Sequence, residues 1–260
     1  MRQVETGLDL TIDPVTMEFG YGAGVLGPKP EFRTLDAIRP SLMDAHCSGP
    51  SPVYSIAMDV RRAEDEGDLK ARYLLFGVVA YATGRLGIEP VRSQGHIHAI
   101  APHSGWSPPE LFEIWEGKAI IYAQQRATDE PGHCVAVTAG PGDKVVVPPG
   151  WAHSVINADT DKRMVFGAWC DRQFGFEYND VRAHGGLAYF PIVQPDGAIG
   201  WIANGRYQAR GLEQRESRSY PEFGLDPVKP VYAQYRSNPK SVEWVAQPQQ
   251  FAGLWPRFEP

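Results

Sequence analysis

PPGWAHSVIN, Pro148–Asn157, is the most informative stretch of the sequence, and GHIHAI, Gly95–Ile100, lies about fifty residues before it. In the first stretch, a Pro-Pro-Gly turn leads through His153 into residues typical of a β-strand. In the second, His96 and His98 are two residues apart, so on a strand their side chains point to the same face. Neutral imidazole is a common metal ligand. The three histidines therefore either gather around one ion or are scattered polar residues with no common role.

Segments on both sides of these stretches have the composition of short β-strands. They are rich in β-branched and aromatic residues, and turns such as PGD and PPG separate them. Short strands at such intervals predict an all-β sandwich or barrel. Glu116-Gly117 is expected to be the turn of a hairpin. The predicted strands lie within 52–60, 70–83, 111–115, 119–125, 133–139, 144–147, 153–157 and 163–169, and a last one within 185–193.

The chain divides into three parts by composition. Residues 1–51 are predicted to form an N-terminal arm, because Gly and Pro punctuate them and Pro40 prevents a long helix near Thr34–Asp44. Residues 52–193 are predicted to form the barrel. Residues 194–260 form a polar C-terminal extension that holds many aromatic residues, so we expect it to pack on the barrel or on a partner subunit. Within it, Asn238-Pro239 before KSVEWVA predicts a short helix.

The composition argues against several classes of protein. The chain has 260 residues and a net charge of −6, so a broad surface for nucleic acid is not expected, although a local basic pocket for one phosphate is compatible with this charge. Its three cysteines are odd in number and form no CxxC pair, which favours a reducing compartment. No apolar run is typical of a signal peptide or a membrane helix, so we expect a cytoplasmic protein without a membrane partner.

The histidine stretches resemble the two motifs of the cupin superfamily. The second motif has the order G, five residues, P, one residue, G, two residues, H, three residues, N. The residues that follow this spacing are Gly142, Pro148, Gly150, His153 and Asn157. The first motif is similar to His96, His98, Glu110 and Gly117, although the segment between His98 and Glu110 is several residues longer than usual.

The cupin resemblance implies a fold and a metal site. The fold is a jelly-roll barrel, also called a double-stranded β-helix, and it would hold one divalent ion, such as iron, nickel, zinc or manganese. The implied ligands are His96, His98, Glu110 and His153. Glu113 is the alternative carboxylate ligand if the longer segment shifts the register of its strand; otherwise alternation places it on the opposite face. His103, within the longer segment, is expected at the surface.

A narrower resemblance is to the cupin-type glucose-6-phosphate isomerases of archaea and some bacteria. The blocks that carry it span about residues 50–193 and are PVYSIAMDV, EGDL, SQGHIHA, PELFEIWEGKA, PPGWAHSVIN and FGFEYNDVRAHGG. The resemblance implies an isomerase of glycolysis and gluconeogenesis that interconverts glucose 6-phosphate and fructose 6-phosphate. Cupins of this kind commonly pair edge strands, so a homodimer is expected.

The implied chemistry moves hydrogen between C1 and C2 of the sugar. A divalent ion would polarise the carbonyl and stabilise an enediolate, and Glu110 is the candidate general base. A hydride shift is the alternative route. At the phosphate end, the residues expected to contact substrate are Arg92, Ser93, Gly95 and Tyr178. Arg92, Ser93 and Tyr178 can equally be structural: a surface charge, a strand-end residue and a packed aromatic.

The sequence also departs from the isomerase pattern. Phe176 stands where the family tends to have His, Gly150 replaces a bulky aromatic residue, and Leu74 lies near the place of a phosphate-contacting Thr. Two other functions are therefore compared, a cupin non-haem iron oxygenase and a non-catalytic sugar-binding cupin. A basic residue that faces the cavity, about a sugar's length from the metal, would favour the sugar-phosphate isomerase. An apolar cavity without a phosphate anchor would favour the oxygenase.

Overall fold

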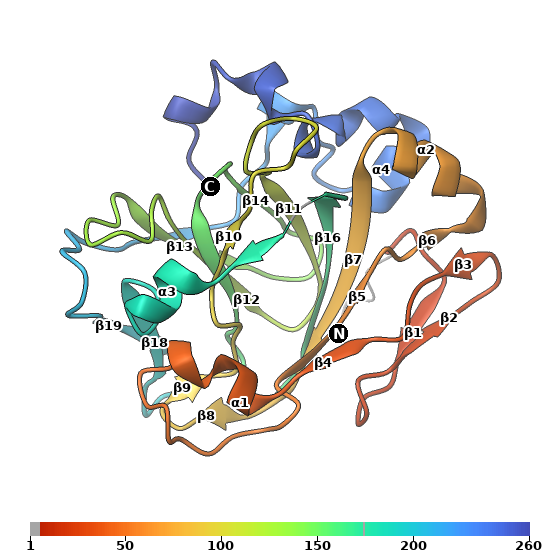
Figure 1. Cartoon of the computed structure of the whole chain (residues 1–260). Coiled ribbons are helices and arrows are strands. Elements are labelled where there is room, and N and C mark those ends of the chain that lie inside the picture. Colours follow the sequence, from red (N-terminus) through yellow and green to blue (C-terminus); the bar gives the residue numbers. More distant parts are fainter. Residues whose placement is uncertain (1–5, 174) are drawn as a thin grey trace.

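The computed structural model describes residues 6–173 and 175–260, and two large β-sheets dominate it (Figure 1). The six-stranded sheet has the order β14 (Lys144–Val147), β11 (Glu110–Glu116), β16 (Met164–Asp171), β7 (Leu74–Tyr81), β5 (Tyr54–Met58) and β4 (Glu31–Arg33). The four-stranded sheet has the order β15 (Ala152–Asn157), β12 (Ala119–Gln124), β13 (Cys134–Ala139) and β20 (Glu213–Glu216). Neighbouring strands are antiparallel except β13 and β20. This architecture is the all-β jelly-roll barrel predicted from the sequence.

Short elements flank the two sheets. The two-stranded pairs are β1 (Leu10–Ile12) with β2 (Phe19–Tyr21), β3 (Val25–Leu26) with β6 (Arg61–Arg62), β8 (Arg85–Leu86) with β9 (Glu89–Pro90), β10 (Ile97–His98) with β17 (Phe176–Glu177), and β18 (Tyr189–Val193) with β19 (Ile199–Ala203). The α-helices are α1 (Leu35–Ile38), α2 (Glu66–Ala71), α3 (Asn179–Ala183) and α4 (Val231–Ser237). The 3₁₀-helices are η1 (Arg39–Ser41), η2 (Ala63–Asp65), η3 (Pro221–Phe223), η4 (Pro239–Ser241), η5 (Glu243–Val245), η6 (Pro248–Phe251) and η7 (Trp255–Arg257). Among the described helices, none has the length and apolar character of a transmembrane segment.

Both faces of the six-stranded sheet are buried, which explains why its strand β7 has no charged residue. Along β7, Leu75 and Val79 point into the barrel, while Phe76 and Val78 belong to a second apolar cluster on the outer face. Successive side chains of a strand point to opposite faces, so a strand covered on one side only would alternate with polar residues. The whole of β7 is buried instead.

Different segments cover the outer faces of the two sheets. Residues 220–258 of the C-terminal extension, blue in Figure 1, pack on the six-stranded sheet, where the Tyr232 ring stacks on Trp169 with the ring centres 5.5 Å apart. The segment from α3 to about residue 212 covers the four-stranded sheet, where Trp201 lies 5.6 Å from Tyr122 between ring centres. Burial of these aromatic rings supplies the hydrophobic stabilisation that holds each cover in place.

The turn at Glu116-Gly117 is not a hairpin, which corrects the prediction from the sequence. β11 pairs with β14 and β16, whereas β12 pairs with β13 and β15, so the turn carries the chain from one sheet to the other. Gly117 has a φ of +79°, and a Cβ at this position would lie 2.4 Å from the Arg163 carbonyl oxygen. Glycine is therefore required by both the backbone conformation and the close approach of the neighbouring chain.

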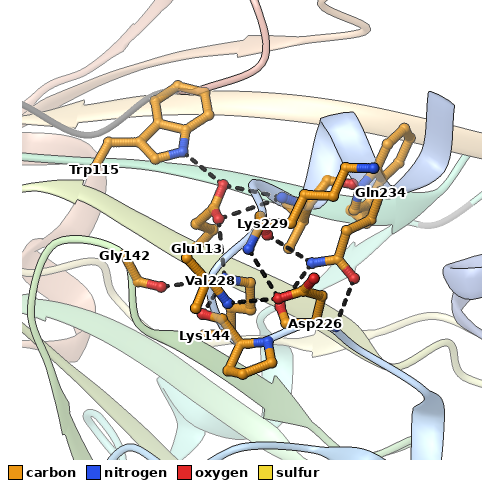
Figure 2. A network of polar contacts seen from close by, with 11 residues as sticks. Glu113, Trp115, Gly142, Lys144, Asp226, Val228, Lys229 and Gln234 are labelled. Atoms are coloured by element: carbon orange, nitrogen blue, oxygen red, sulfur yellow. Dashed lines mark hydrogen bonds and ion pairs between the residues drawn. The ribbon is translucent and has the colours of Figure 1, made fainter. Parts of the chain in front are cut away.

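A buried ion pair links the barrel to the C-terminal extension (Figure 2). Glu113 lies 3.3 Å from Lys144 Nζ, and both side chains are almost fully buried. Glu113 also accepts hydrogen bonds from Trp115 Nε1 and the Val231 backbone amide, and Lys144 donates to the Pro227 carbonyl oxygen. Burial raises the pKa of Glu113, opposed by the Trp115 hydrogen bond and the charge of Lys144. Polar groups from the barrel and the extension thus satisfy one another.

Strand pairing crosses the boundaries expected from composition. β4 lies within 1–51 and joins the six-stranded sheet, and β20 lies within 194–260 and joins the four-stranded sheet. β18, at the expected end of the barrel, pairs with β19 outside both large sheets. The short helix predicted at Asn238-Pro239 is confirmed as η4, a 3₁₀-helix, where the Asn238 side chain accepts a hydrogen bond from the Lys240 amide.

Candidate metal centre

The two histidine stretches lie side by side in the structure. The His96 amide donates to the His153 carbonyl oxygen at 3.0 Å, and the His153 amide donates to the His96 carbonyl oxygen at 2.9 Å. His98 is the last residue of β10, and His153 is the second residue of β15. Two reciprocal backbone bonds of this kind hold the neighbouring side chains at a short, fixed distance. The ring centres of His96 and His153 are 4.4 Å apart as a result.

The longer segment between His98 and Glu110 folds back on itself and returns the carboxylate to the histidines. Ala101 and Trp106 form an isolated antiparallel bridge within it. The Ser107 hydroxyl donates to the His98 carbonyl oxygen at 2.5 Å. Glu110, the first residue of β11, then lies with its Oε2 3.0 Å from His153 Nε2 and 3.4 Å from His98 Nε2. The extra residues therefore form a compact loop and do not displace the carboxylate.

Backbone carbonyl groups orient two of the imidazole rings. His98 Nδ1 lies 3.0 Å from the Pro108 carbonyl oxygen, and His153 Nδ1 lies 3.1 Å from the Trp151 carbonyl oxygen. A protonated Nδ1 that donates to a carbonyl leaves Nε2 with a free lone pair, which is the tautomer that a metal ligand needs. In both rings this Nε2 faces Glu110.

The donor set is suited to a divalent transition metal. One ligand atom from each of His96, His98, Glu110 and His153 lies within 4.8 Å of all the others, and the group is largely buried. His96 Nε2 is buried and has no hydrogen-bond partner among the described residues. A buried polar atom without a partner is costly, and a bound ion would satisfy it. Three imidazoles and one carboxylate match the preferences of iron, nickel, zinc and manganese.

The electrostatics of the group agree with this donor chemistry. Burial lowers the pKa of His96 well below its ordinary value, and the neighbouring His153 lowers it further, so the ring is neutral at pH 7. Burial tends to raise the pKa of Glu110, but the hydrogen bonds from His153 and His98 outweigh it, and the net shift is downward. A neutral imidazole and an ionised carboxylate are the protonation states in which these groups bind metals.

Cys170 contacts the carboxylate of Glu110, whereas Glu113, the alternative carboxylate ligand, lies elsewhere. The Cys170 thiol donates to Glu110 Oε1 at 3.2 Å and holds that oxygen inside the barrel. Burial raises the pKa of Cys170 well above its ordinary value, so the thiol stays protonated. Glu113 points to the other face of β11 and pairs with Lys144, so it is not near the histidines. No local motif marks the Cys170 contact, because it forms between two different strands.

His103 is not at the surface, which corrects the expectation for this residue. Its side chain is only 11% exposed, and its Nε2 lies 2.5 Å from Oδ2 of the fully buried Asp171. The imidazole also stacks on Tyr73, with ring centres 4.0 Å apart. These contacts hold the longer loop against the start of β7 and the end of β16.

A cavity of about 600 Å³, part of it open to solvent, is lined by three of the four clustered residues, His96, Glu110 and His153. Apolar side chains form much of its wall, among them Phe112, Phe166 and Phe176. The polar and charged side chains that line it are Arg33, Tyr54, Tyr81, Ser93, Gln94, His96, Glu110, His153 and Tyr178. Of the described residues that line this cavity, Arg33 is the only lysine or arginine.

The residues predicted to contact substrate fall into two groups. Ser93 and Tyr178 line the cavity, and the Tyr178 ring lies 6.0 Å from the His96 ring between centres. Gly95 does not line it; a Cβ there would lie 2.7 Å from a Leu187 methyl carbon, so this glycine is needed for packing. The Ser93 hydroxyl accepts a hydrogen bond from the Val155 amide at 3.1 Å.

Arg92 lies outside the cavity, which corrects its predicted role at the substrate. The side chain is buried, and its guanidinium pairs with Glu89 at 2.6 Å. It also donates to the carbonyl oxygens of Ser41 and Ser93 at 2.7 and 3.0 Å. A buried arginine held by a carboxylate and two carbonyls has a structural role.

Arg33, Tyr54 and Gln94 are cavity residues that sequence reasoning missed. Arg33 lies in β4 of the N-terminal arm, and its backbone pairs with Tyr54 in β5. The Tyr54 ring stacks on Tyr81, with ring centres 4.9 Å apart. Burial raises the pKa of Tyr178, and the positive charge of Arg33 opposes this rise. No local motif marks Arg33; only the pairing of β4 with β5 brings it to the cavity.

The comparison with known protein families decides the assignment. The family model of glucose-6-phosphate isomerase (GPI) matches residues 37–208, about two thirds of the chain. The chain belongs to the glucose-6-phosphate isomerase family. As a member of that family it is an enzyme, an isomerase, and the resemblance seen in its sequence is confirmed.

Curated relatives with the name glucose-6-phosphate isomerase support membership of the glucose-6-phosphate isomerase family. The protein from Thermococcus kodakarensis is 25% identical over 75% of this chain and 97% of its own length. The protein from Pyrococcus horikoshii is 25% identical over 75% of this chain and 98% of its own length. Among solved structures, a variant of the oxalate decarboxylase of Bacillus subtilis is 17% identical with a TM-score of 0.33, over 48% of this chain and 27% of that chain. The barrel is assigned from its strand order and not from this low score.

Proposed function

We propose that the chain interconverts glucose 6-phosphate and fructose 6-phosphate with a divalent ion held by His96, His98, Glu110 and His153. The curated relatives carry the name of this activity, and they match this chain over nearly their whole length. The four clustered residues support the metal, because their donor atoms converge in a buried group that includes an unpartnered imidazole nitrogen among the described residues. The reaction would belong to glycolysis and gluconeogenesis.

The position of Arg33 in the cavity lining is the observation that supports a phosphorylated sugar as substrate. Arg33 is a fixed positive charge that lines the same cavity as His96, Glu110 and His153. Tyr178 lies near His96, and the charge of Arg33 acts on it. The ion pair of Arg33, with Glu31 at 3.1 Å, is solvent-exposed and therefore weak. A planar guanidinium binds phosphate oxygens through paired hydrogen bonds. The apolar walls then contact the carbon skeleton of the sugar.

The chain's own residues suggest two routes for the hydrogen. A divalent ion bound at the cluster would polarise the sugar carbonyl and stabilise the enediolate that connects aldose and ketose. Glu110 is the proposed base that carries the proton between C1 and C2. Both of its oxygens already have partners, however, since Oε1 accepts from Cys170 and Oε2 lies against His153. Because of this geometry, a hydride shift between C1 and C2 is the second proposed route. Deuterium uptake from D₂O into the product would indicate proton transfer, and its absence would indicate the hydride shift.

An isomerase assay on fructose 6-phosphate tests the proposal. We expect glucose 6-phosphate to form, activity to be lost after chelation, and activity to return with one or more of Fe²⁺, Ni²⁺, Zn²⁺ and Mn²⁺. The assay is run with the full chain and with each metal in turn. Turnover that survives complete removal of metal would contradict the metal requirement, and no turnover with any metal would contradict the reaction.

Arg33→Met should raise KM for fructose 6-phosphate about 10- to 100-fold and lower kcat much less. The side chain is proposed to bind the phosphate equally in the ground state and the transition state, and a hydrogen bond to a charged group is worth about 1.5–3 kcal/mol. Steady-state kinetics of the metal-loaded variant measure the change. Arg85→Met, at an exposed arginine far from the cavity lining, is the matched control and should leave KM unchanged. An unchanged KM in Arg33→Met would refute the proposed phosphate anchor.

The predicted homodimer remains a prediction, as does the division of the chain at residues 51 and 193. Light scattering of the purified chain would measure the mass in solution.

A further inference from the structure

A second recess, apart from the catalytic cavity, collects positive charge. It measures about 870 Å³, opens to solvent, and lies between the α1–η1 segment and the loops that follow α3 and β19. Arg39, Arg182, Arg206 and His184 line it, and none of its described lining residues is an aspartate or a glutamate. The chain as a whole has a net charge of −6, so three arginines around one acid-free hollow depart from the average surface.

The charges in this recess are poorly neutralised. Arg182 and Arg206 form no ion pair within the described part of the chain. Arg39 pairs with Asp36 at 2.6 Å, but the Asp36 side chain is 86% exposed, so water screens this pair. His184 Nε2 lies 3.0 Å from Asp129, which is also well exposed. A net positive potential therefore remains in the hollow.

The fold orients Arg39 and leaves space for Arg206, while both guanidinium groups keep N–H donors without a partner among the described residues. Arg39 Nη1 donates to the carbonyl oxygens of Ala45 and Cys47 at 2.8 and 2.9 Å, which orients the guanidinium. Gly185 has a φ of +66°, and a Cβ there would lie 3.0 Å from Arg206 Nη1, so glycine permits the close approach of Arg206. Each guanidinium has five N–H donors, and these contacts use only some of them.

Arg182 connects this recess to the catalytic cavity. Its Nε donates to Gln94 Oε1 at 3.0 Å, and its guanidinium carbon lies 5.0 Å from the centre of the Tyr178 ring. Both Gln94 and Tyr178 line the catalytic cavity. Arg182 lies in α3, which follows β17, and β17 pairs with β10 and its ligand His98. A ligand that binds the Arg182 guanidinium would therefore alter the contacts of Arg182 with Gln94 and Tyr178, two residues of the cavity wall.

We propose that the recess formed by Arg39, Arg182 and Arg206 binds a small phosphate-bearing anion, and that the bound anion acts on the catalytic cavity through Arg182. Clustered arginines recognise phosphate by paired, charge-assisted hydrogen bonds, and the hollow has room for a phosphorylated metabolite. The binding site stands on its own contacts. The effect on catalysis rests on the proposed isomerase function.

Binding of inorganic phosphate tests the site without any assay of activity. Isothermal titration calorimetry is run at constant ionic strength, with KCl replacing phosphate salt, in the Arg33→Met background so that the catalytic cavity contributes least. Adding Arg206→Gln should weaken phosphate binding about tenfold or more, because a charged donor is lost. Within the described residues, the Arg206 side chain makes one long hydrogen bond, to the Ala183 carbonyl at 3.4 Å, so this change does not threaten the fold. Equal phosphate affinity with and without Arg206→Gln would overturn the site.

Steady-state kinetics test whether an anion in the recess changes catalysis, separately from whether it binds. With wild-type protein and saturating fructose 6-phosphate, inorganic phosphate should change kcat by at least twofold, and Arg206→Gln should abolish this effect. A phosphate effect that is the same in both proteins would show that it arises in the catalytic cavity and would overturn the coupling. If the chain proves inactive on fructose 6-phosphate, the calorimetric comparison still decides the binding site, so failure of the isomerase proposal and failure of the site are distinguishable.

Discussion

Glu110→Gln should lower kcat/KM by about 10²- to 10⁴-fold and reduce the amount of bound divalent ion. The amide matches the carboxylate in shape, but it lacks the negative charge that draws a cation to the oxygen beside His153 Nε2 and His98 Nε2. Both carboxylate oxygens of Glu110 are held in place, Oε1 by Cys170 and Oε2 beside His153. The substitution therefore removes the only anionic side chain among the four clustered residues. Mass spectrometry of the metal content and steady-state kinetics give the two readouts.

Glu116→Gln is the matched control for that experiment. It makes the same change at the other end of β11, where the carboxylate pairs with Arg163 at 2.8 Å and both side chains are partly exposed. An exposed pair of this kind contributes about 0–1 kcal/mol, so metal content and kcat/KM should stay near the wild-type values. A Glu110→Gln protein that retains full metal content and full turnover would contradict the assigned carboxylate.

Lys144→Met should lower the free energy of unfolding by about 3–5 kcal/mol at neutral pH. The substitution leaves Glu113 buried without its cation, and an uncompensated buried charge is among the most destabilising changes in a protein. Figure 2 shows that the same lysine also reaches the C-terminal extension, so docking of the extension is weakened as well. Urea unfolding, followed by tryptophan fluorescence, measures the loss.

The loss should depend on pH in a defined direction. Burial already raises the pKa of Glu113 in the folded protein, and removal of Lys144 raises it further. A carboxyl with a folded pKa above its unfolded value destabilises the folded state at pH values where it is ionised, and the cost disappears below the ordinary value of 4.5. The Lys144→Met deficit should therefore be larger at pH 8 than at pH 5.

Two further variants make this result specific to the buried pair. The double variant Glu113→Gln with Lys144→Met removes both charges and should recover about half of the loss or more. Lys162→Met, at an exposed lysine paired with Asp159, should cost less than about 1 kcal/mol. A Lys144→Met protein no less stable than Lys162→Met would show that the pair has no structural role.

The fold and the convergence of His96, His98, Glu110 and His153 could be predicted because their signals are local. The strands are marked by β-branched residues between turns, and the spacing from Gly142 to Asn157 fixes the position of His153 after its turn. His96 and His98 share a face by simple alternation. The hairpin expected at Glu116-Gly117 was wrong because a tight glycine turn has the same sequence whether it joins paired strands or connects two sheets.

The substrate end could not be predicted because it depends on contacts between distant segments. In the sequence, Arg92 looks like an exposed cation close to His96. In the structure it is buried, where it pairs with Glu89 and donates to the Ser41 carbonyl oxygen. Arg33 lies more than sixty residues before His96, the first of the clustered histidines, and only the addition of β4 to the six-stranded sheet brings it to the cavity. Register between strands distant in sequence is not encoded in any local motif.

The covering of both sheets restricts how two copies of the chain can associate. The family model ends at residue 208, and much of the segment that packs on Trp169 and the rest of the six-stranded sheet lies beyond that point. The four-stranded sheet is covered in turn by residues that include Val181 and Leu187. Within the described residues, a protein layer therefore covers the broad outer face of each large sheet, so a second molecule would meet these layers and not the sheets themselves. Contact between copies would have to form along strand edges such as β4, or through loops.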